Sequence, residues 1–243
     1  MSQSISRPTA ARPRLTAAGY NCIGKHFGMA FSLGFPLFLG AGTLNWDWAW
    51  VITLLTLVGW TVLSIVLVIT NPELLNERGR RAKALVGTKR WDWAIMGIYS
   101  VLLLATPLVA GLDYRYAWSS PSADSIKVAG ITVLIVSFIP LTWSMAVNRY
   151  FEPTVRIQDN REHRVITSGP YRYVRHPGYV AVVLQFVAIP LSLGTFTAWI
   201  PALLGIALFI LRTALEDRTL IAELPGYADY AQRTRYRLLP GVW

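Results

Sequence analysis

Several side chains that can do chemistry are concentrated in one short polar segment. They are two histidines, two tyrosines and an arginine, namely His163, Tyr171, Arg175, His176 and Tyr179. Imidazole, phenol and guanidinium groups donate hydrogen bonds, transfer protons or bind anions. Gly-Pro and Pro-Gly pairs interrupt the segment, and such pairs mark turns rather than helix interiors. The segment is therefore predicted to be a loop that presents several side chains to one cavity.

A second set of ionisable residues follows a long apolar stretch. Residues 178–211 contain no Asp, Glu, Lys, Arg or His, and Arg212 and Glu216 come directly after them. Their spacing places both side chains on one face of a helix, where an isolated pair is ordinarily an ion pair worth about 0.3–0.5 kcal/mol. At the mouth of a pocket, Arg212 would instead hold a carboxylate or phosphate, and Glu216 would accept hydrogen bonds from a cofactor. The sequence leaves both interpretations open.

The chain ends in an aromatic, turn-rich tail. It contains Tyr227, Tyr230, Tyr236 and Trp243, interrupted by two Pro-Gly pairs. Aromatic faces attract cations by roughly 0.5–2 kcal/mol, which suits a sulfonium ligand. The polar loop and this tail flank the apolar stretch, so a reversal of the chain within the stretch would bring them together.

The composition identifies a membrane protein. Hydrophobic residues make up 53% of the chain and charged residues only 15%, whereas soluble proteins contain roughly 25% charged residues. The net charge of +10 is not accompanied by a nucleic-acid-binding motif, so no nucleic acid partner is expected. The single cysteine, Cys22, excludes an intramolecular disulfide and a cysteine-cluster metal site, and no metal is expected.

Charge-free windows predict the fold, because a charge at the bilayer centre costs roughly 2.5–3.5 kcal/mol. The expected class is all-α, a polytopic transmembrane helical bundle with a C-terminal helical hairpin and a cytoplasmic cofactor pocket. Six spans are predicted, over residues 27–46, 48–70, 93–112, 128–148, 178–191 and 196–211. The last two form the hairpin, since 178–211 is too long for one crossing and the run 192–195 favours a reversal.

The distribution of basic residues predicts the orientation. In a six-span topology, 21 of the 23 Lys and Arg residues lie on one side, and only Arg115 and Lys127 lie on the other. Basic loops stay in the cytoplasm, so both termini are predicted to be cytoplasmic. The expected organisation is a disordered basic arm over 1–26, three spans over 27–127 and a functional core over 128–243.

The order of these motifs resembles the isoprenylcysteine carboxyl methyltransferase family. The resemblance covers about residues 128–243 and rests on the run from His163 to Tyr171, on Arg175-His176-Pro177-Gly178-Tyr179, on Arg212-x-x-x-Glu216, and on the Tyr-x-x-Tyr and Leu-Leu-Pro of the tail. One departure is that Gly226 directly precedes Tyr227, whereas the family usually separates its glycine from the Tyr-x-x-Tyr.

The resemblance implies S-adenosylmethionine bound at the cytoplasmic membrane face. Carried over position by position, it implies that Arg212 orients the methyl acceptor and that Glu216 and His176 belong to the catalytic site. The residues it implies for cofactor binding are His163, Arg164, Val165, Ile166, Tyr171, His176, Pro177, Gly178, Tyr179, Glu216, Tyr227 and Tyr230.

The methyl acceptor stays open at this point. A carboxylate acceptor, such as that of an isoprenylcysteine, needs no base, whereas a thiol or amine loses a proton, for which His176 or Glu216 is the candidate base. Phospholipid N-methyltransferases and thiol S-methyltransferases share parts of the pattern. The acceptor is expected to be a lipid, a lipidated molecule or another small molecule, entering between the hairpin and the fourth span if it carries an apolar tail.

Two other classes of protein compete with this interpretation. An NADPH-dependent, sterol-reductase-like membrane enzyme has a somewhat similar C-terminal ending, but here Pro177 follows His176 as in the methyltransferases. A transporter or scaffold is less favoured, since transporters place ionisable groups near the membrane midplane and the charge-free windows offer none.

Overall fold

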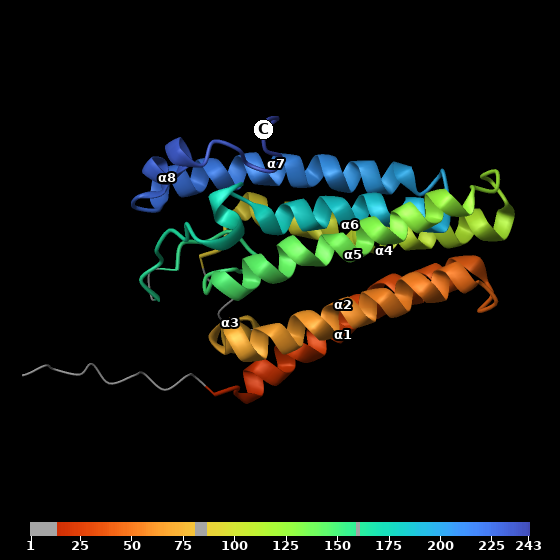
Figure 1. Cartoon of the computed structure of the whole chain (residues 1–243), viewed down its shortest axis with the longest axis horizontal. Coiled ribbons are helices and arrows are strands. Elements are labelled where there is room, and N and C mark those ends of the chain that lie inside the picture. Colours follow the sequence, from red (N-terminus) through yellow and green to blue (C-terminus); the bar gives the residue numbers. More distant parts are fainter. Residues whose placement is uncertain (1–13, 81–86, 159–160) are drawn as a thin grey trace, which may run out of the picture.

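In the computed structural model, the described residues are 14–80, 87–158 and 161–243. Six long apolar helices run side by side as a bundle (Figure 1): α1 (Ala17–Ala41), α2 (Asp47–Thr70), α4 (Arg90–Tyr116), α5 (Asp124–Val147), α6 (Pro177–Leu193) and α7 (Trp199–Glu223). Short helical segments gather at one end of the bundle: α3 (Pro72–Gly79), the 3-10 turn η2 (Gly169–Arg172) and α8 (Tyr227–Arg233).

The long helices have the dimensions of membrane spans. Five of them are long and apolar enough to cross a bilayer, and α6 is a shorter apolar helix. With 17 residues, α6 is about 25 Å long, slightly less than a hydrocarbon core of about 30 Å. Helices satisfy their backbone hydrogen bonds internally, as a membrane requires. The predicted polytopic helical bundle is confirmed, and the chain is an integral membrane protein.

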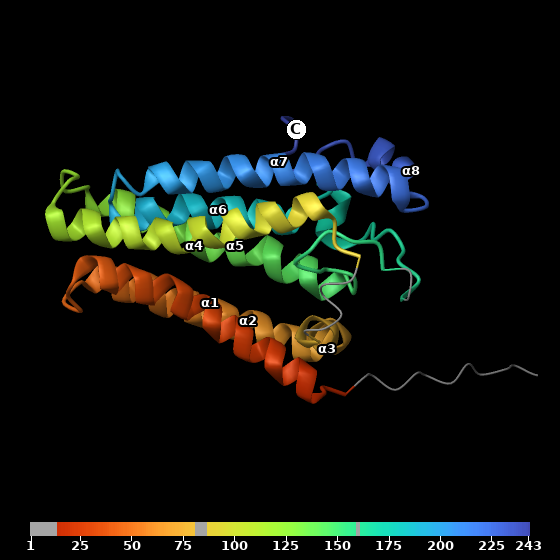
Figure 2. The same ribbon diagram turned by 180° about the vertical axis from the view of Figure 1, so that it is seen from behind.

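The helices form two layers, visible from both sides in Figures 1 and 2. The α1–α2 hairpin and α3 form one layer, and α4 to α7 form the other. The layers meet closely where α1 crosses α4: a Cβ on Gly40 would overlap the carbonyl oxygen of Leu108, and one on Gly111 would overlap that of Leu37. Small residues allow such close approach between helices in membranes.

Helices α6 and α7 form the predicted C-terminal hairpin. The chain reverses after Gly194, which ends α6 with a φ of +68°, a left-handed conformation that favours glycine. Helix α7 continues to Glu223, well beyond the predicted end at Leu211. Its last turns therefore carry Arg212 and Glu216 out to the polar end of the bundle.

The predicted disordered arm over 1–26 is wrong for residues 17–26, which form the start of α1. Residues 1–13 of that arm lie outside the described residues. The helix begins early because its polar side chains find partners inside the bundle. His26 is 3% exposed, its Nδ1 lies 2.8 Å from Ser64 Oγ, and its Nε2 lies 3.7 Å from Cys22 Sγ. The predicted span started at residue 27 because a charge-free window stops at an ionisable residue such as His26. The helix itself extends back to Ala17.

The polar end of the bundle contains the segments that the sequence assigns to the cytoplasm. The start of α1, α3, residues 148–158 and 161–176, and α8 all lie there (Figure 1). The turns that join α1 to α2, α4 to α5 and α6 to α7 lie at the opposite end. This arrangement agrees with an even number of spans, and the cytoplasmic location of the polar end stays a prediction.

Candidate functional site

A cavity opens to solvent at the polar end of the bundle, and its empty space, open mouth included, is about 790 Å³. The cavity walls are residues 148–158 and 163–166, η2, the first turn of α6, the last turns of α7 and helix α8. The two parts of the sequence with the densest chemistry, the polar loop and the aromatic tail, therefore face each other across it.

The polar loop is fixed to the C-terminal tail by backbone hydrogen bonds. The N–H of Arg175 donates to the carbonyl of Tyr236 at 2.9 Å, and that of His176 donates to Arg237 at 3.0 Å. Upstream, Gly169 turns the chain with a φ of +59°, and a Cβ there would lie 2.9 Å from Trp143 Nε1. These constraints hold His176 at the start of α6, facing the cavity.

A fully buried carboxylate joins the walls of the cavity. Asp217 Oδ1 accepts a hydrogen bond from Tyr227 Oη at 3.0 Å and lies 3.3 Å from His176 Nε2. Its Oδ2 pairs with Arg237 Nε at 2.9 Å and with Arg175 Nη2 at 3.0 Å. Asp217 therefore connects α7 to the polar loop, to α8 and to the tail.

The tyrosines of the cavity form a hydrogen-bonded wall. Tyr171 accepts at Oη from Asn148 Nδ2 at 2.8 Å, and its carbonyl accepts from Tyr230 Oη at 2.7 Å. Burial raises the pKa of Tyr171 and of Tyr227 above the ordinary range, and it raises that of Tyr230 to about 12. These side chains are therefore neutral phenols at physiological pH.

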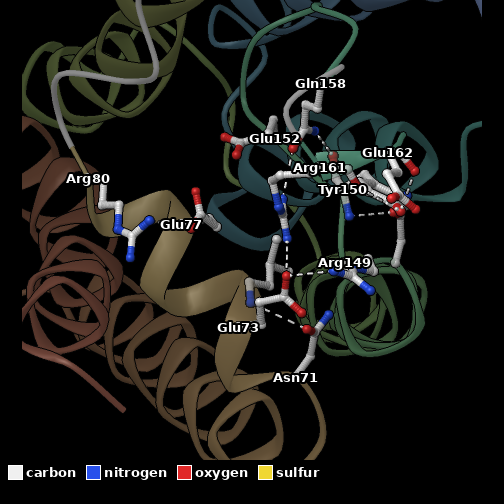
Figure 3. Close-up of polar contacts among 12 residues, drawn as sticks. Asn71, Glu73, Glu77, Arg80, Arg149, Tyr150, Glu152, Gln158, Arg161 and Glu162 are labelled. Atoms are coloured by element: carbon white, nitrogen blue, oxygen red, sulfur yellow. Dashed lines mark hydrogen bonds and ion pairs between the residues drawn. The ribbon is translucent and has the colours of Figure 1, made fainter. Parts of the chain in front are cut away.

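Helix α3 holds the opposite wall. Glu73 Oε1 accepts from Arg149 Nη2 at 2.9 Å and from Arg161 Nη2 at 2.8 Å, and both arginines point toward it in Figure 3. Further along this wall, Tyr150 Oη donates to the carbonyl of Glu162 at 2.9 Å. Although burial opposes ionisation of Glu73, hydrogen bonds and charge from the two arginines lower its pKa.

Two buried guanidinium nitrogens on the cavity wall have no hydrogen-bond partner among the described residues. They are Arg156 Nε and Arg175 Nε. Buried donors are nearly always hydrogen-bonded, so these two nitrogens are exceptions among the residues that line the cavity. In the described ranges, no group of three or more His, Cys, Asp or Glu side chains is placed to hold a metal ion.

The cavity brings together eleven of the thirteen residues that the resemblance implicates, and leaves out Pro177 and Arg212. Pro177 is the first residue of α6 and is buried there. The eleven that line the cavity are His163, Arg164, Val165, Ile166, Tyr171, His176, Gly178, Tyr179, Glu216, Tyr227 and Tyr230.

Arg212 occupies a different place from the one predicted. It is 2% exposed and pairs with Asp92, with Nε 2.8 Å from Oδ1, while its Nη2 donates to the carbonyl of Pro153 at 2.7 Å. The other interpretation, an ion pair between Arg212 and Glu216, is not seen in the described residues, where Glu216 accepts a hydrogen bond from Tyr179 Oη. The guanidinium lies 5.0 Å from the centroid of the Tyr179 ring, at the rear of the cavity wall.

Sequence reasoning missed the part of the cavity wall that precedes the polar loop. Residues 148–158 carry no motif, because they follow α5 without regular structure. Asp92 was also missed, because it lies just outside a charge-free window. Asp217 was missed although it directly follows the implicated Glu216. The lining residues that the sequence analysis did not name are Asn148, Tyr150, Phe151, Glu152, Thr154, Val155, Arg156, Gln158, Leu220 and Leu224.

A second, apolar cavity lies deeper in the bundle, between both layers. Helix α6 lines both cavities with one face: Gly178 and Tyr179 contact the first, and Val182, Phe186 and Ile189 contact the second. The empty space of the second cavity, including the part that opens to the outside, is about 520 Å³. Its other walls are Met29, Ser32, Leu33, Thr56, Trp60, Tyr99, Leu103, Leu134, Phe138 and Gln185.

Comparison with known proteins supports the resemblance. Residues 130–222 match the family model of the Isoprenylcysteine carboxyl methyltransferase (ICMT) family. The matched region includes most of α5, the polar loop, α6 and most of α7, so it contains most of the cavity wall.

Two curated relatives are metal-resistance proteins. The chain is 28% identical over 147 residues to the cobalt-zinc-cadmium resistance protein CzcN of Cupriavidus metallidurans. The aligned residues cover 57% of this chain and 61% of that protein. It is 29% identical over 143 residues to the nickel-cobalt-cadmium resistance protein NccN of Alcaligenes xylosoxydans xylosoxydans. Here the aligned residues cover 56% of this chain and 59% of that protein. The chain thus spans about three fifths of the length of these relatives.

Proposed function

Because residues 130–222 match the model of the isoprenylcysteine carboxyl methyltransferase family, we propose that this membrane protein transfers a methyl group from S-adenosylmethionine to an acceptor with an apolar chain. The observation that carries the proposal is the polar cavity, in which eleven implicated residues from three separate parts of the chain line one space. By the positive-inside rule, the cavity opens to the cytoplasm.

The residues of the cavity fit the proposed cofactor group by group. The unpaired Arg156 Nε and Arg175 Nε suit its carboxylate, and the half-buried Glu216 suits a hydroxyl or ammonium group. Leu220 and Leu224 suit the apolar surface of a nucleoside base. Bound there, S-adenosylmethionine would supply an electrophilic methyl group on a sulfonium.

The protein residues act by orienting and enclosing the reactants. The neutral ring faces of Tyr171, Tyr179 and Tyr227 attract a cation without pairing with it, so they favour binding without neutralising the sulfonium charge. Asp217 fixes the orientation of His176 and Tyr227 through its contacts with both. Positioning and exclusion of water are the main contributions that methyl transfer needs.

The acceptor determines whether a base is required. A carboxylate acceptor carries no proton to remove, so the site needs none. A thiol or amine acceptor loses a proton, and the candidate bases are His176 and Glu216, which both line the cavity. The names of the two relatives concern metal resistance and specify no reaction, so the acceptor is proposed from the cavities alone.

The apolar cavity supports an acceptor with a hydrocarbon tail. It follows the polar cavity along one face of α6, so a molecule whose reactive group lies near Tyr179 can extend its tail past Val182 toward Phe186. Filling this space with hydrocarbon gains about 25 cal/mol for each Å² of apolar surface removed from water. The entry route between the hairpin and α5 stays a prediction, and α1, α2 and α4 line this cavity together with α5 and α6.

Methyl transfer to a panel of acceptors tests the proposal. Purified protein in detergent would be incubated with methyl-labelled S-adenosylmethionine and a prenylated cysteine, a long-chain thiol, an amino phospholipid, or the short-chain analogue of each. We expect label in at least one long-chain acceptor and much less in its short analogue. Equal transfer to both analogues would remove the tail from the proposal, and label in none would contradict methyl transfer to these acceptor classes.

A further inference from the structure

A buried aspartate from the first half of the chain contacts the rear of the polar cavity. Asp92 lies in the first turn of α4 and is 0% exposed. Its Oδ1 accepts from Arg212 Nε at 2.8 Å. Its Oδ2 accepts from the backbone N–H of Val155 at 2.7 Å and from Arg212 Nη2 at 3.3 Å. The carboxylate therefore binds α7 and the irregular cavity wall at the same time.

The wall contacts fix a segment that has no regular structure of its own. Val155 is held from both sides, since its carbonyl also accepts from the N–H of Lys89 at 3.2 Å. The carbonyl of Pro153 accepts from Arg212 Nη2 at 2.7 Å. Thr154 and Arg156, the neighbours of Val155, both line the cavity. Asp92 thus sets the position of the wall that carries the unpaired Arg156 Nε.

The arginine contacts extend to the opposite wall. Held by Asp92, the Arg212 guanidinium lies 5.0 Å from the centroid of the Tyr179 ring, within cation–π distance. Tyr179 in turn donates a hydrogen bond to Glu216, and both of these residues line the cavity. A chain of direct contacts therefore runs from Asp92 through Arg212 and Tyr179 to Glu216.

We infer that Asp92 is a positioning residue of the cofactor site, acting through Arg212 and Val155. The inference rests on the proposed function, and it assigns a role in the site to a residue outside the matched region 130–222. Neither Asp92 nor Arg212 lines the cavity. Their contribution is to fix the two walls relative to each other, which preorganised binding requires.

A matched control lies on the same helix. Asp113, near the other end of α4, is 2% exposed, and its Oδ2 accepts from the hydroxyls of Ser119 and Thr197, each at 2.6 Å. It also joins α4 to the hairpin region through Thr197, but at the C-terminal end of α4, whereas Asp92 lies in the first turn. Asp113 therefore shares the burial and the structural role of Asp92 without its position beside the site.

The test compares affinity for S-adenosylhomocysteine with thermal stability in the full-length protein. Isothermal titration and melting curves would be measured for the wild type, Asp92→Asn and Asp113→Asn. We expect both variants to melt at lower temperature. Only Asp92→Asn is expected to bind more weakly, by about tenfold, the change that follows from the loss of one charge-assisted contact. Equal affinity of Asp92→Asn and the wild type would overturn the inference.

Two further variants separate positioning from stability. The double variant Asp92→Asn/Arg212→Gln removes both buried charges, so it is expected to regain stability relative to Asp92→Asn while affinity stays low. If the double variant recovered affinity together with stability, the ion pair between Asp92 and Arg212 would be merely structural, and the inference would be overturned. If Asp92→Asn fails to fold, Arg212→Lys replaces it, because lysine keeps the charge but cannot contact Asp92, Pro153 and the Tyr179 face as Arg212 does; wild-type affinity there would equally overturn the inference.

The wild-type titration separates the two claims. Absence of S-adenosylhomocysteine binding by the wild type would contradict the proposed function itself. Binding by the wild type with unchanged affinity in the variants would contradict only the positioning role of Asp92.

Discussion

At the scale of single residues, neighbouring side chains on α7 face different partners. Arg212 points to Asp92, Glu216 to Tyr179, and Asp217 to a cluster of His176, two arginines and Tyr227. A helix spreads successive side chains over different faces, so adjacent residues reach separate parts of the site. Their removal should accordingly produce different defects.

Replacement of Glu216 by Gln should weaken the binding of S-adenosylhomocysteine by about tenfold or more, because a hydrogen bond to a charged group contributes about 1.5–3 kcal/mol. Isothermal titration would measure this loss. Glu223→Gln is the control, since Glu223 lies on the same helix and pairs with Lys89 at the surface. Unchanged affinity of Glu216→Gln would remove Glu216 from the site.

Replacement of Tyr227 by Phe should lower stability more than affinity. The change removes the hydroxyl that donates to the buried Asp217 at 3.0 Å but keeps the ring. Loss of this hydrogen bond should cost about 1–3 kcal/mol of unfolding free energy. Thermal melting would measure it, and a variant as stable as the wild type would show that Asp217 does not need this donor.

The sequence predicted which residues gather at the site better than it predicted their contacts. His163, Tyr171 and His176 belong to one turn-rich segment, so local signals sufficed to place them near each other. The partner of Arg212 is Asp92, which lies 120 positions earlier. Such a pair depends on how α4 packs against α7, and no periodicity in the sequence reveals it.

At the scale of elements, the short helix α3 holds the irregular cavity wall. Glu73 receives two arginines from that wall, whereas Glu77, one turn later, pairs with Arg80 close to its own helix at 2.6 Å (Figure 3). The sequence gave no indication that Glu73 contacts Arg149 and Arg161. An isolated helix of this length is marginal in water, so its position depends on these contacts.

Replacement of Glu73 by Gln should loosen the wall. We expect faster cleavage by trypsin after Arg149 and Arg161, which lose their shared carboxylate. Glu77→Gln is the matched control and should be cleaved at the wild-type rate. Equal rates for both variants would contradict a role of α3 in holding the wall.

Acidification should have the same effect as the Glu73 substitution. The folded-state pKa of Glu73 is lowered overall, although burial opposes this, so its contribution to stability is complete above its unfolded pKa. That contribution is lost as the pH falls through the lower folded pKa. Hydrogen exchange of the wall segment would be measured from neutral pH to below the ordinary glutamate pKa of about 4.3. The opening of the wall, relative to the intrinsic exchange rate at each pH, should rise in the wild type but not in Glu73→Gln. The same rise in the variant would assign it to another group.

At the scale of the whole molecule, the two helix layers depend on glycines at the α1–α4 crossing. The sequence predicted the number of apolar helices, since each is a long charge-free window. It did not predict their packing order, because lipid-facing and buried faces are both apolar and only close-packed geometry distinguishes them. Gly40 and Gly111 mark the crossing once the structure is known.

Replacement of Gly111 by Ala should push the layers apart. The added methyl group would overlap the backbone of α1, and overpacking of this kind costs about 1–3 kcal/mol. Gly97→Ala is the control on the same helix, because a Cβ there meets nothing within 4 Å. Melting temperatures in one detergent would compare the two variants. A Gly111→Ala protein as stable as Gly97→Ala would contradict the close crossing.

The central claim is that the polar cavity binds the S-adenosyl cofactor. Titration of the detergent-purified protein with S-adenosylhomocysteine, beside the same titration with NADPH, tests it most directly. The account predicts saturable binding of S-adenosylhomocysteine that is lost in His176→Ala, and no binding of NADPH. Binding of NADPH alone would contradict the account and indicate a reductase.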